Sequence, residues 1–136
     1  DSNVGGWGAY LIWGEHTLEL CGGEIDTTNN KMELTAAIEG LKAVKNKSVE
    51  TDVYLDSAYV LNGITSWIEG WKQKGWVNSK KQPVANKELW LELDEIRQQF
   101  AHIEFHKVKG HSDNEGNNKA DELANRGMDE ILGIGA

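Results

Sequence analysis

The spacing of apolar residues along this chain changes from every second position to every third or fourth, and this change most constrains its fold. Residues 6–13 alternate, a turn follows at residues 14–15, and residues 17–21 form a second extended run. Such alternation predicts a β-hairpin. Over residues 34–45 the apolar side chains recur at helical spacing. The chain therefore combines paired strands with helices.

The remaining segments follow the same two periods. Residues 53–55 predict a short apolar strand, and residues 103–108 predict another. Three helical stripes are predicted to be buried, at Val60, Ile64, Trp67, Ile68 and Trp71, at Leu89, Leu93, Ile96 and Phe100, and at Ala120, Leu123 and Ala124. The last helix is expected to end near Gly127. The order β-β-α-β-α-α-β-α predicts a mixed α/β sheet covered by helices, in a single domain over residues 1–136.

Composition is that of a globular protein and excludes several classes. A chain of 136 residues with 39% hydrophobic and 26% charged residues is typical of one folded domain. No apolar run reaches the roughly 18 residues of a membrane helix, and residues 1–4 lack a signal-peptide pattern. We therefore expect a soluble, cytoplasmic protein with no membrane partner. Cys21, the single cysteine, predicts a core thiol rather than a disulfide or a zinc site.

The charge of the chain is unevenly distributed. The net charge of −8 argues against an acidic partner such as nucleic acid. The segment 71–90, however, holds five lysines and one glutamate, a local +4 that leaves −12 elsewhere. Lysines neutralise phosphates and aromatic rings stack on sugar or base, so this segment with Trp76 predicts a nucleic-acid surface. The alternative is a solvated loop, and for Trp67, Trp71 and Trp90 we expect core positions.

Three acidic residues lie at the ends of predicted elements, and each has two interpretations. Asp56 closes the strand at residues 53–55, where α/β sheets gather catalytic groups, but could instead cap the helix that follows. Glu33 stands three residues after Asn30, the spacing of a capping box. Asp121 lies on the last helix, where an aspartate is commonly a surface residue. None of the three is decisive alone.

The histidines divide in a similar way. His111 opens a polar loop after the last predicted strand, where an imidazole that titrates near neutrality could move protons or water. A loop histidine without function is the alternative. For His16, His102 and His106 we predict structural or solvent-exposed roles. The chain has no Gly-x-Ser-x-Gly elbow and no Walker phosphate loop, so neither a serine nucleophile nor a P-loop is supported.

Taken together, these segments resemble the bacterial-type, type 1 ribonuclease H family. The resembling segments, in family order, are residues 28–34 (TNNKMEL), 55–60 (LDSAYV), 63–68 with Trp71 and residues 75–76, 108–111 (VKGH) and 121–124 (DELA). The likeness covers about residues 5–127. It implies a ribonuclease H-like mixed five-stranded sheet of order 3-2-1-4-5 flanked by helices, with a basic protrusion at about residues 71–90. It also implies hydrolysis of the RNA strand of RNA/DNA hybrids.

The resemblance further implies roles for individual residues. Glu33, Asp56 and Asp121 would be metal ligands, and His111 would assist proton transfer or product release. Clustered carboxylates repel one another unless a divalent cation neutralises them, and hard oxygen ligands select Mg²⁺, with Mn²⁺ as a substitute. Two ions about 4 Å apart could activate a water for in-line attack without a protein nucleophile. The residues implied to bind the hybrid are Asn29, Asn30, Lys72, Lys74, Trp76, Lys80 and Lys81.

The sequence departs from the family at its N-terminus. Family members begin with a strand that ends in an Asp-Gly-Ser-type motif, which supplies the first catalytic aspartate and the centre of the sheet. This sequence starts after that motif. Strands beside a missing central strand would leave ladder groups unpaired, at roughly 1–3 kcal/mol for each buried one. We therefore expect that the sequence lacks a native N-terminal segment, or that a second chain supplies the strand to an otherwise monomeric protein.

Three functions stay open at this stage. The first is a metal-dependent endonuclease that cleaves the RNA of RNA/DNA hybrids. The second is a hybrid-binding module of the same fold whose catalysis is impaired. The third is a strand-transfer enzyme or integrase, but the Lys-Gly-His loop and the tryptophan protrusion do not belong to that pattern. Magnesium-dependent cleavage distinguishes the first function from the second.

Overall fold

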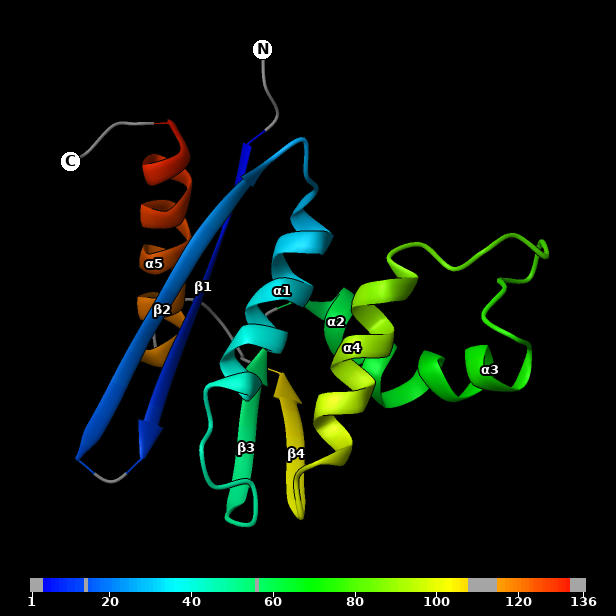
Figure 1. Cartoon of the computed structure of the whole chain (residues 1–136), viewed down its shortest axis with the longest axis horizontal. Coiled ribbons are helices and arrows are strands. Elements are labelled where there is room, and N and C mark those ends of the chain that lie inside the picture. The colour runs from blue at the N-terminus through cyan, green and yellow to red at the C-terminus, as the bar shows by residue number, and fades with distance from the viewer. Residues whose placement is uncertain (1–3, 14, 56, 108–114, 133–136) are drawn as a thin grey trace.

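A computed structural model describes residues 4–13, 15–55, 57–107 and 115–132 (Figure 1). The elements in chain order are β1 (Val4–Trp13), β2 (His16–Ile25), α1 (Asn29–Lys42), β3 (Glu50–Leu55), α2 (Ala58–Asn62), η1 (Gly63–Trp67), α3 (Ile68–Gln73), α4 (Lys87–Gln98), β4 (His102–Lys107) and α5 (Glu115–Leu132). This order confirms the predicted alternation of strands and helices. Within the described ranges, no helix is both long and apolar enough to cross a membrane.

Strands β1 and β2 form the predicted hairpin. They pair antiparallel, from Val4 opposite Ile25 to Trp13 opposite His16. Both strands are longer than the alternation predicts, because the pairing continues through the glycine-rich part of β2. Cys21 lies in this part and is half-buried, so the prediction of a core thiol is wrong.

Strands β3 and β4 form a parallel pair, in which Asp52 lies opposite Glu104 and Tyr54 opposite His106. One face of the pair packs against the hydrophobic core through Val53, Leu55, Ile103 and Phe105. Among the described residues β1 and β2 form one two-stranded sheet, and β3 and β4 form another. The five-stranded sheet implied by the resemblance is therefore seen only as two separate pairs.

The core lies where α1, α2, η1, α3 and α4 pack together beside β3 and β4. Trp90 of α4 has no exposed surface and Ile64 is 1% exposed, as the helical stripes predict. The ring of Trp90 packs so closely against Gly63 that a Cβ there would lie 2.6 Å from ring atom Cζ2. The core cluster consists of Leu34, Ala37, Ile38, Leu41, Val60, Ile64, Ile68, Val84, Trp90, Leu93, Ile96 and Phe100.

The second predicted helix contains a π-helical turn, η1. The amide of Ile68 donates to the carbonyl of Gly63, five residues earlier, which widens the helix at this point. The wider turn shifts the phase of the side chains. Trp67, predicted in the buried stripe, is 41% exposed, so this prediction is wrong. The guanidinium of Arg97 donates to the carbonyl of Ile64 at 3.1 Å and so helps to hold the turn.

The last helix, α5, continues to Leu132, beyond the end predicted at Gly127. Gly127 is buried against β2, where a Cβ would lie 2.6 Å from the carbonyl carbon of Gly22. The glycine lets α5 approach the strand backbone closely and does not end the helix.

Candidate active site and nucleic-acid surface

Glu33 lies in α1, and it is neither the N-cap nor the third residue of that helix. The N-cap is Thr28, whose hydroxyl accepts a hydrogen bond from the amide of Lys31 at 3.2 Å. The third helical position is therefore Lys31, and the first turn of α1 holds no acidic residue. The capping box with Asn30 as the cap is wrong. A structural explanation that competed with a functional role for the half-buried Glu33 is thereby removed.

Asp56 and His111 lie outside the described residues, so their roles as metal ligand and proton carrier stay predictions. The helix that follows Asp56 in the sequence is α2. The N-cap of α2 is Ser57, whose hydroxyl accepts from the amide of Val60 at 3.3 Å.

The helices that carry Glu33 and Asp121 cover opposite faces of β1 (Figure 1). A Cβ on Gly5 would lie 2.8 Å from Cγ of Met32, the residue before Glu33 in α1. A Cβ on Gly8 would lie 2.6 Å from Cβ of Leu123 in α5. Positions of odd and even number in a strand point to opposite faces. Both helices thus meet β1 within four residues, with Asp121 exposed on α5.

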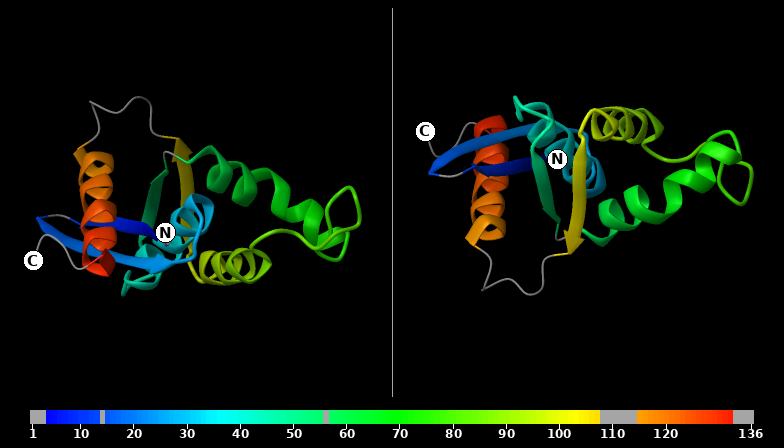
Figure 2. Two further views of the ribbon diagram at one scale, coloured as in Figure 1. Left: turned by 90° about the horizontal axis from the view of Figure 1, so that it is seen from above. Right: turned by 90° about the horizontal axis from the view of Figure 1, so that it is seen from below.

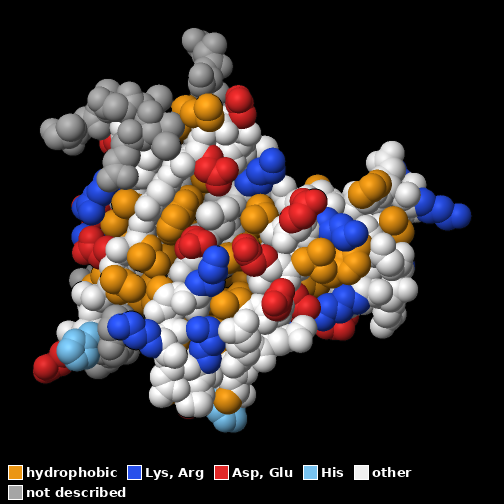
Figure 3. Space-filling model, viewed as in Figure 1, with side chains coloured by type: hydrophobic (Ala, Val, Ile, Leu, Met, Phe, Trp, Pro, Cys, Tyr) orange, Lys and Arg blue, Asp and Glu red, His pale blue; other side chains and the backbone are white. Residues whose placement is uncertain are grey.

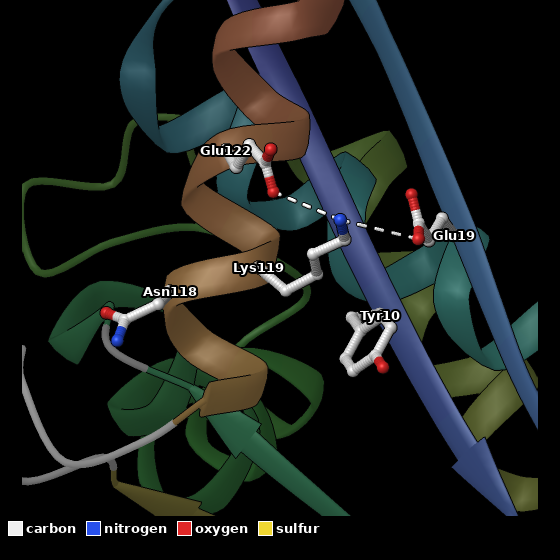
Figure 4. Close-up of a pocket in the computed structure, with 5 residues that line it drawn as sticks. All are labelled: Tyr10, Glu19, Asn118, Lys119 and Glu122. Carbon is white, nitrogen blue, oxygen red and sulfur yellow. Dashed lines mark ion pairs between the residues drawn. The ribbon is translucent and has the colours of Figure 1, made fainter.

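A polar pocket lies between α5 and the hairpin (Figure 4). Its lining residues are Tyr10, Glu19, Asn118, Lys119 and Glu122. The ammonium of Lys119 lies 3.1 Å from a carboxylate oxygen of Glu122 and 3.4 Å from one of Glu19. The hydrogen bond to Glu122 is the largest cause of the raised pKa of Lys119. Arg126 also pairs with Glu19, at 3.7 Å, so both carboxylates of the pocket already have cationic partners.

The segment 71–90 projects away from the hairpin and α5 (Figure 2). Lysine or arginine side chains lie at its outer end (Figure 3). Lys74, Lys80 and Lys81 are exposed and form no ion pair with other described residues. Three of the four predicted phosphate-binding lysines therefore have their charge available to a ligand.

Lys72, the fourth, is held differently. Its ammonium lies 2.8 Å from a carboxylate oxygen of Asp94 and 3.6 Å from one of Glu69. Asp94 is only 6% exposed and also binds Arg97 and the side-chain amide of Gln98. Burial alone would raise the pKa of Asp94, but the hydrogen bonds and charges of Lys72 and Arg97 hold it below the ordinary 3.8. This network joins α3 to α4 at the base of the protrusion.

The tryptophans of the protrusion form one aromatic cluster with Tyr59. The ring centroids of Trp71 lie 5.3 Å from those of Trp90 and 6.0 Å from those of Trp67 and Trp76. Trp76 has a left-handed backbone, with φ of 65°. Its amide bonds to the carbonyl of Trp71 at 2.7 Å, which holds this uncommon conformation. The cluster makes the protrusion a packed unit.

One further group of possible metal ligands was not predicted from the sequence. Ligand atoms of Asp52, Glu104 and His106 all lie within 4.8 Å of one another. Glu33 and Asp121 belong to no such group within the described part of the chain. The sequence does place Asp52 in one strand, and Glu104 and His106 two positions apart in another, where they share a face. Only the register of the two strands shows that these side chains meet.

Comparison with known proteins decides the family. The sequence model described as RNase H matches residues 1–129. The chain belongs to the RNase H family. It is 53% identical over 130 residues to the Ribonuclease H of Acidovorax sp. (strain JS42), and the match covers 95% of this chain and 87% of that protein. It is 55% identical over 125 residues to the Ribonuclease H of Rhizobium etli, and this match covers 92% of this chain and 82% of that protein.

Solved structures agree on the fold. The RNase H family chain superimposes on LC9-RNase H1, a type 1 RNase H with the type 2 active-site motif, with a TM-score of 0.73. The two are 24% identical, and the match covers 95% of this chain and 72% of the other. The RNase H-like α/β fold is therefore confirmed. RNase H membership also implies a divalent metal ion, and the carboxylates of Glu33, Asp56 and Asp121 are the hard oxygen donors that suit one.

Proposed function

We infer that this chain hydrolyses the RNA strand of RNA/DNA hybrids as a ribonuclease H. The observation that carries this inference is its identity of 53% and 55% with two proteins named Ribonuclease H, each over more than nine-tenths of this chain. The five resembling segments lie within the matched residues 1–129. An endonuclease is therefore favoured over an integrase of the same fold.

We propose that Glu33, Asp56 and Asp121 hold Mg²⁺, with Mn²⁺ as a substitute. Their all-carboxylate donor set fits both ions. One point of the structure supports the set: α1 and α5, which carry Glu33 and Asp121, meet β1 within four residues. Two bound ions would activate a water and stabilise the leaving 3′-oxygen. His111 would carry a proton or assist product release.

We propose that the hybrid is held on two surfaces. Asn29 and Asn30 are exposed in the first turn of α1, where amide side chains can hydrogen-bond the 2′-hydroxyls that distinguish RNA. The exposed lysines of the protrusion, with Trp76, would hold the phosphates of the DNA strand. The ion pairs of Lys72 suit it to fixing the protrusion at residues 71–90 within the single domain.

We also propose that β1–β2 and β3–β4 flank the central strand of a five-stranded sheet of order 3-2-1-4-5. In this family numbering the central strand is strand 1, so the strands of this chain would lie in the order β2, β1, central strand, β3, β4. The central strand, with the first catalytic aspartate, would lie between β1 and β3. In the described ranges these two strands are each paired on one side only, which supports the proposal. A strand supplied within one chain predicts a monomer by light scattering, and one supplied by another chain predicts a larger species. Slow amide exchange on both edges is expected only when the strand is present.

A cleavage assay with labelled RNA in a hybrid tests the function. We expect cleavage that requires Mg²⁺ and is abolished by Asp56→Asn and by Glu33→Gln. Glu39→Gln removes the same charge from the same helix and is the matched control, with activity unchanged. All variants should keep the wild-type melting temperature within a few degrees.

Two results would oppose the proposal. Full activity in Glu33→Gln or Asp56→Asn would contradict the assigned ligands. Salt-sensitive binding of the hybrid without cleavage, in both Mg²⁺ and Mn²⁺, would make the chain a hybrid-binding module instead.

A further inference from the structure

The face of β3 and β4 turned away from the core carries ionisable side chains that the proposed nuclease function does not use. Glu50, Asp52 and Tyr54 are exposed at alternate positions of β3. In the parallel register they lie opposite His102, Glu104 and His106 of β4. The strands thus present two imidazoles and three carboxylates on one surface.

Three of these side chains converge. The ligand atoms of Asp52, Glu104 and His106 lie within 4.8 Å of one another. Nε2 of His106 is already 2.9 Å from a carboxylate oxygen of Asp52. Ligands bonded to zinc at about 2.1 Å are separated by roughly 3.4 Å in a tetrahedral site. The side chains of His106 and Asp52 are 37% and 46% exposed, so small rotations can bring the ligand atoms to this separation.

The positions of the three side chains are set by the sheet. Asp52 and Glu104 are direct cross-strand neighbours, and two like charges in this position destabilise a strand pair. The ring of Tyr54 stacks on His106, with centroids 5.0 Å apart and planes at 26°, which orients the imidazole. A bound cation would relieve the repulsion between the carboxylates. The ligands come from hydrogen-bonded strands rather than from loops, so little ordering is needed.

We propose that Asp52, Glu104 and His106 form a second cation site, for a divalent first-row transition metal such as Zn²⁺. One imidazole nitrogen and two carboxylates make a three-ligand set, which leaves a fourth position for water. The imidazole distinguishes the site from an all-oxygen magnesium site. Binding would clamp β3 to β4 and stabilise the folded chain.

Calorimetric titration of the chain with ZnCl₂, in millimolar MgCl₂ that occupies the proposed nuclease site, tests this inference. We expect one Zn²⁺ per chain at this site and a higher melting temperature with zinc. Loss of an outer-shell partner typically weakens a metal site about 10–100-fold, so His106→Ala, which removes a ligand, should weaken binding at least about tenfold. His102→Ala removes a histidine from the same face and should bind as wild type does.

Glu104→Gln provides a second ligand variant that keeps the size of the side chain, and circular dichroism checks that each variant is folded. Equal zinc affinity in wild type, His106→Ala and Glu104→Gln would overturn the proposal, as would no binding to wild type. Glu33→Gln separates the two sites. It should lose hybrid cleavage but retain zinc binding, whereas loss of zinc binding in Glu33→Gln would place the ion at the nuclease site and overturn the second one.

Discussion

Asp94 is a nearly buried carboxylate that stays ionised because Lys72 and Arg97 bind it. Its three partners come from α3 and α4, so one side chain connects the base of the protrusion to the core. A buried charge that loses its partner is costly. Lys72 is therefore best understood as the residue that balances Asp94, whereas the exposed lysines farther along the loop are available for phosphates.

The lowered pKa of Asp94 predicts a loss of stability in acid. Because the folded-state pKa lies below the ordinary 3.8, the contribution is complete above about pH 4 and is lost as the pH falls toward the folded value. Urea unfolding from pH 7 to pH 3 should show this dependence in wild type. Asp94→Asn should be less stable at pH 7, by less than the about 3–5 kcal/mol of fully buried pairs because Lys72 and Arg97 are partly exposed.

Comparing the stability of wild type and Asp94→Asn at low pH tests whether the charge of Asp94 stabilises the fold. The difference in unfolding free energy between wild type and Asp94→Asn should shrink as the pH falls below 4. A difference that stays constant from pH 7 to pH 3 would show that the charge of Asp94 does not stabilise the fold.

At the scale of elements, the start of α1 separates a structural residue from residues proposed to bind the substrate. Thr28 caps the helix, while Asn29 and Asn30 are exposed beside it. The same turn therefore holds one residue that stabilises the helix and two whose side chains face solvent. Substitution of Thr28 should therefore lower stability, whereas substitution of Asn30 should lower affinity for the hybrid.

Thr28→Ala should destabilise the chain by about 0.5–2 kcal/mol, because it removes the acceptor for the amide of Lys31. Asn30→Ala should change stability by less than about 0.5 kcal/mol, because it makes no cap, but should weaken binding of the hybrid. Thermal unfolding and hybrid titration of both variants measure this. The capping assignment fails if Asn30→Ala proves the more destabilising of the two.

At the scale of the whole molecule, the uneven charge governs how an acidic protein meets a polyanion. The chain carries −8 overall but +4 over residues 71–90. The protrusion stands away from the acidic body of the molecule (Figure 2). We expect only the protrusion to contact the phosphates of the hybrid. The salt dependence of the binding constant should then arise from a few lysines.

The double variant Lys80→Gln, Lys81→Gln should reduce the slope of log K against log salt by about 2, one for each lost phosphate contact. Lys72→Gln should change the slope by less than about 1 and should lower stability instead, because its partner is Asp94. Fluorescence anisotropy of a labelled hybrid in EDTA, where no cleavage occurs, gives both slopes. Equal slopes in wild type and the double variant would rule out the lysine surface.

Local patterns in the sequence were sufficient for the order of the elements. The alternation in β1 and β2 and the stripe from Leu89 to Phe100 predict a strand pair and a helix, because side-chain period depends only on neighbours in the chain. The same holds for the motifs that name Glu33, Asp56 and Asp121, whose residue types and spacing identify the family before any contact is known.

Contacts between distant segments decided the rest. Trp67 is exposed because a π turn widens the helix, and α5 continues past Gly127 because β2 lies against it. The group of Asp52, Glu104 and His106 exists only through the parallel register of two strands about fifty residues apart in sequence. Sequence by itself determined the elements and the family and led to the proposed acidic ligands, because these follow from local period and motif. Tertiary structure alone decided which side chains meet, because packing and register join residues that no local pattern connects.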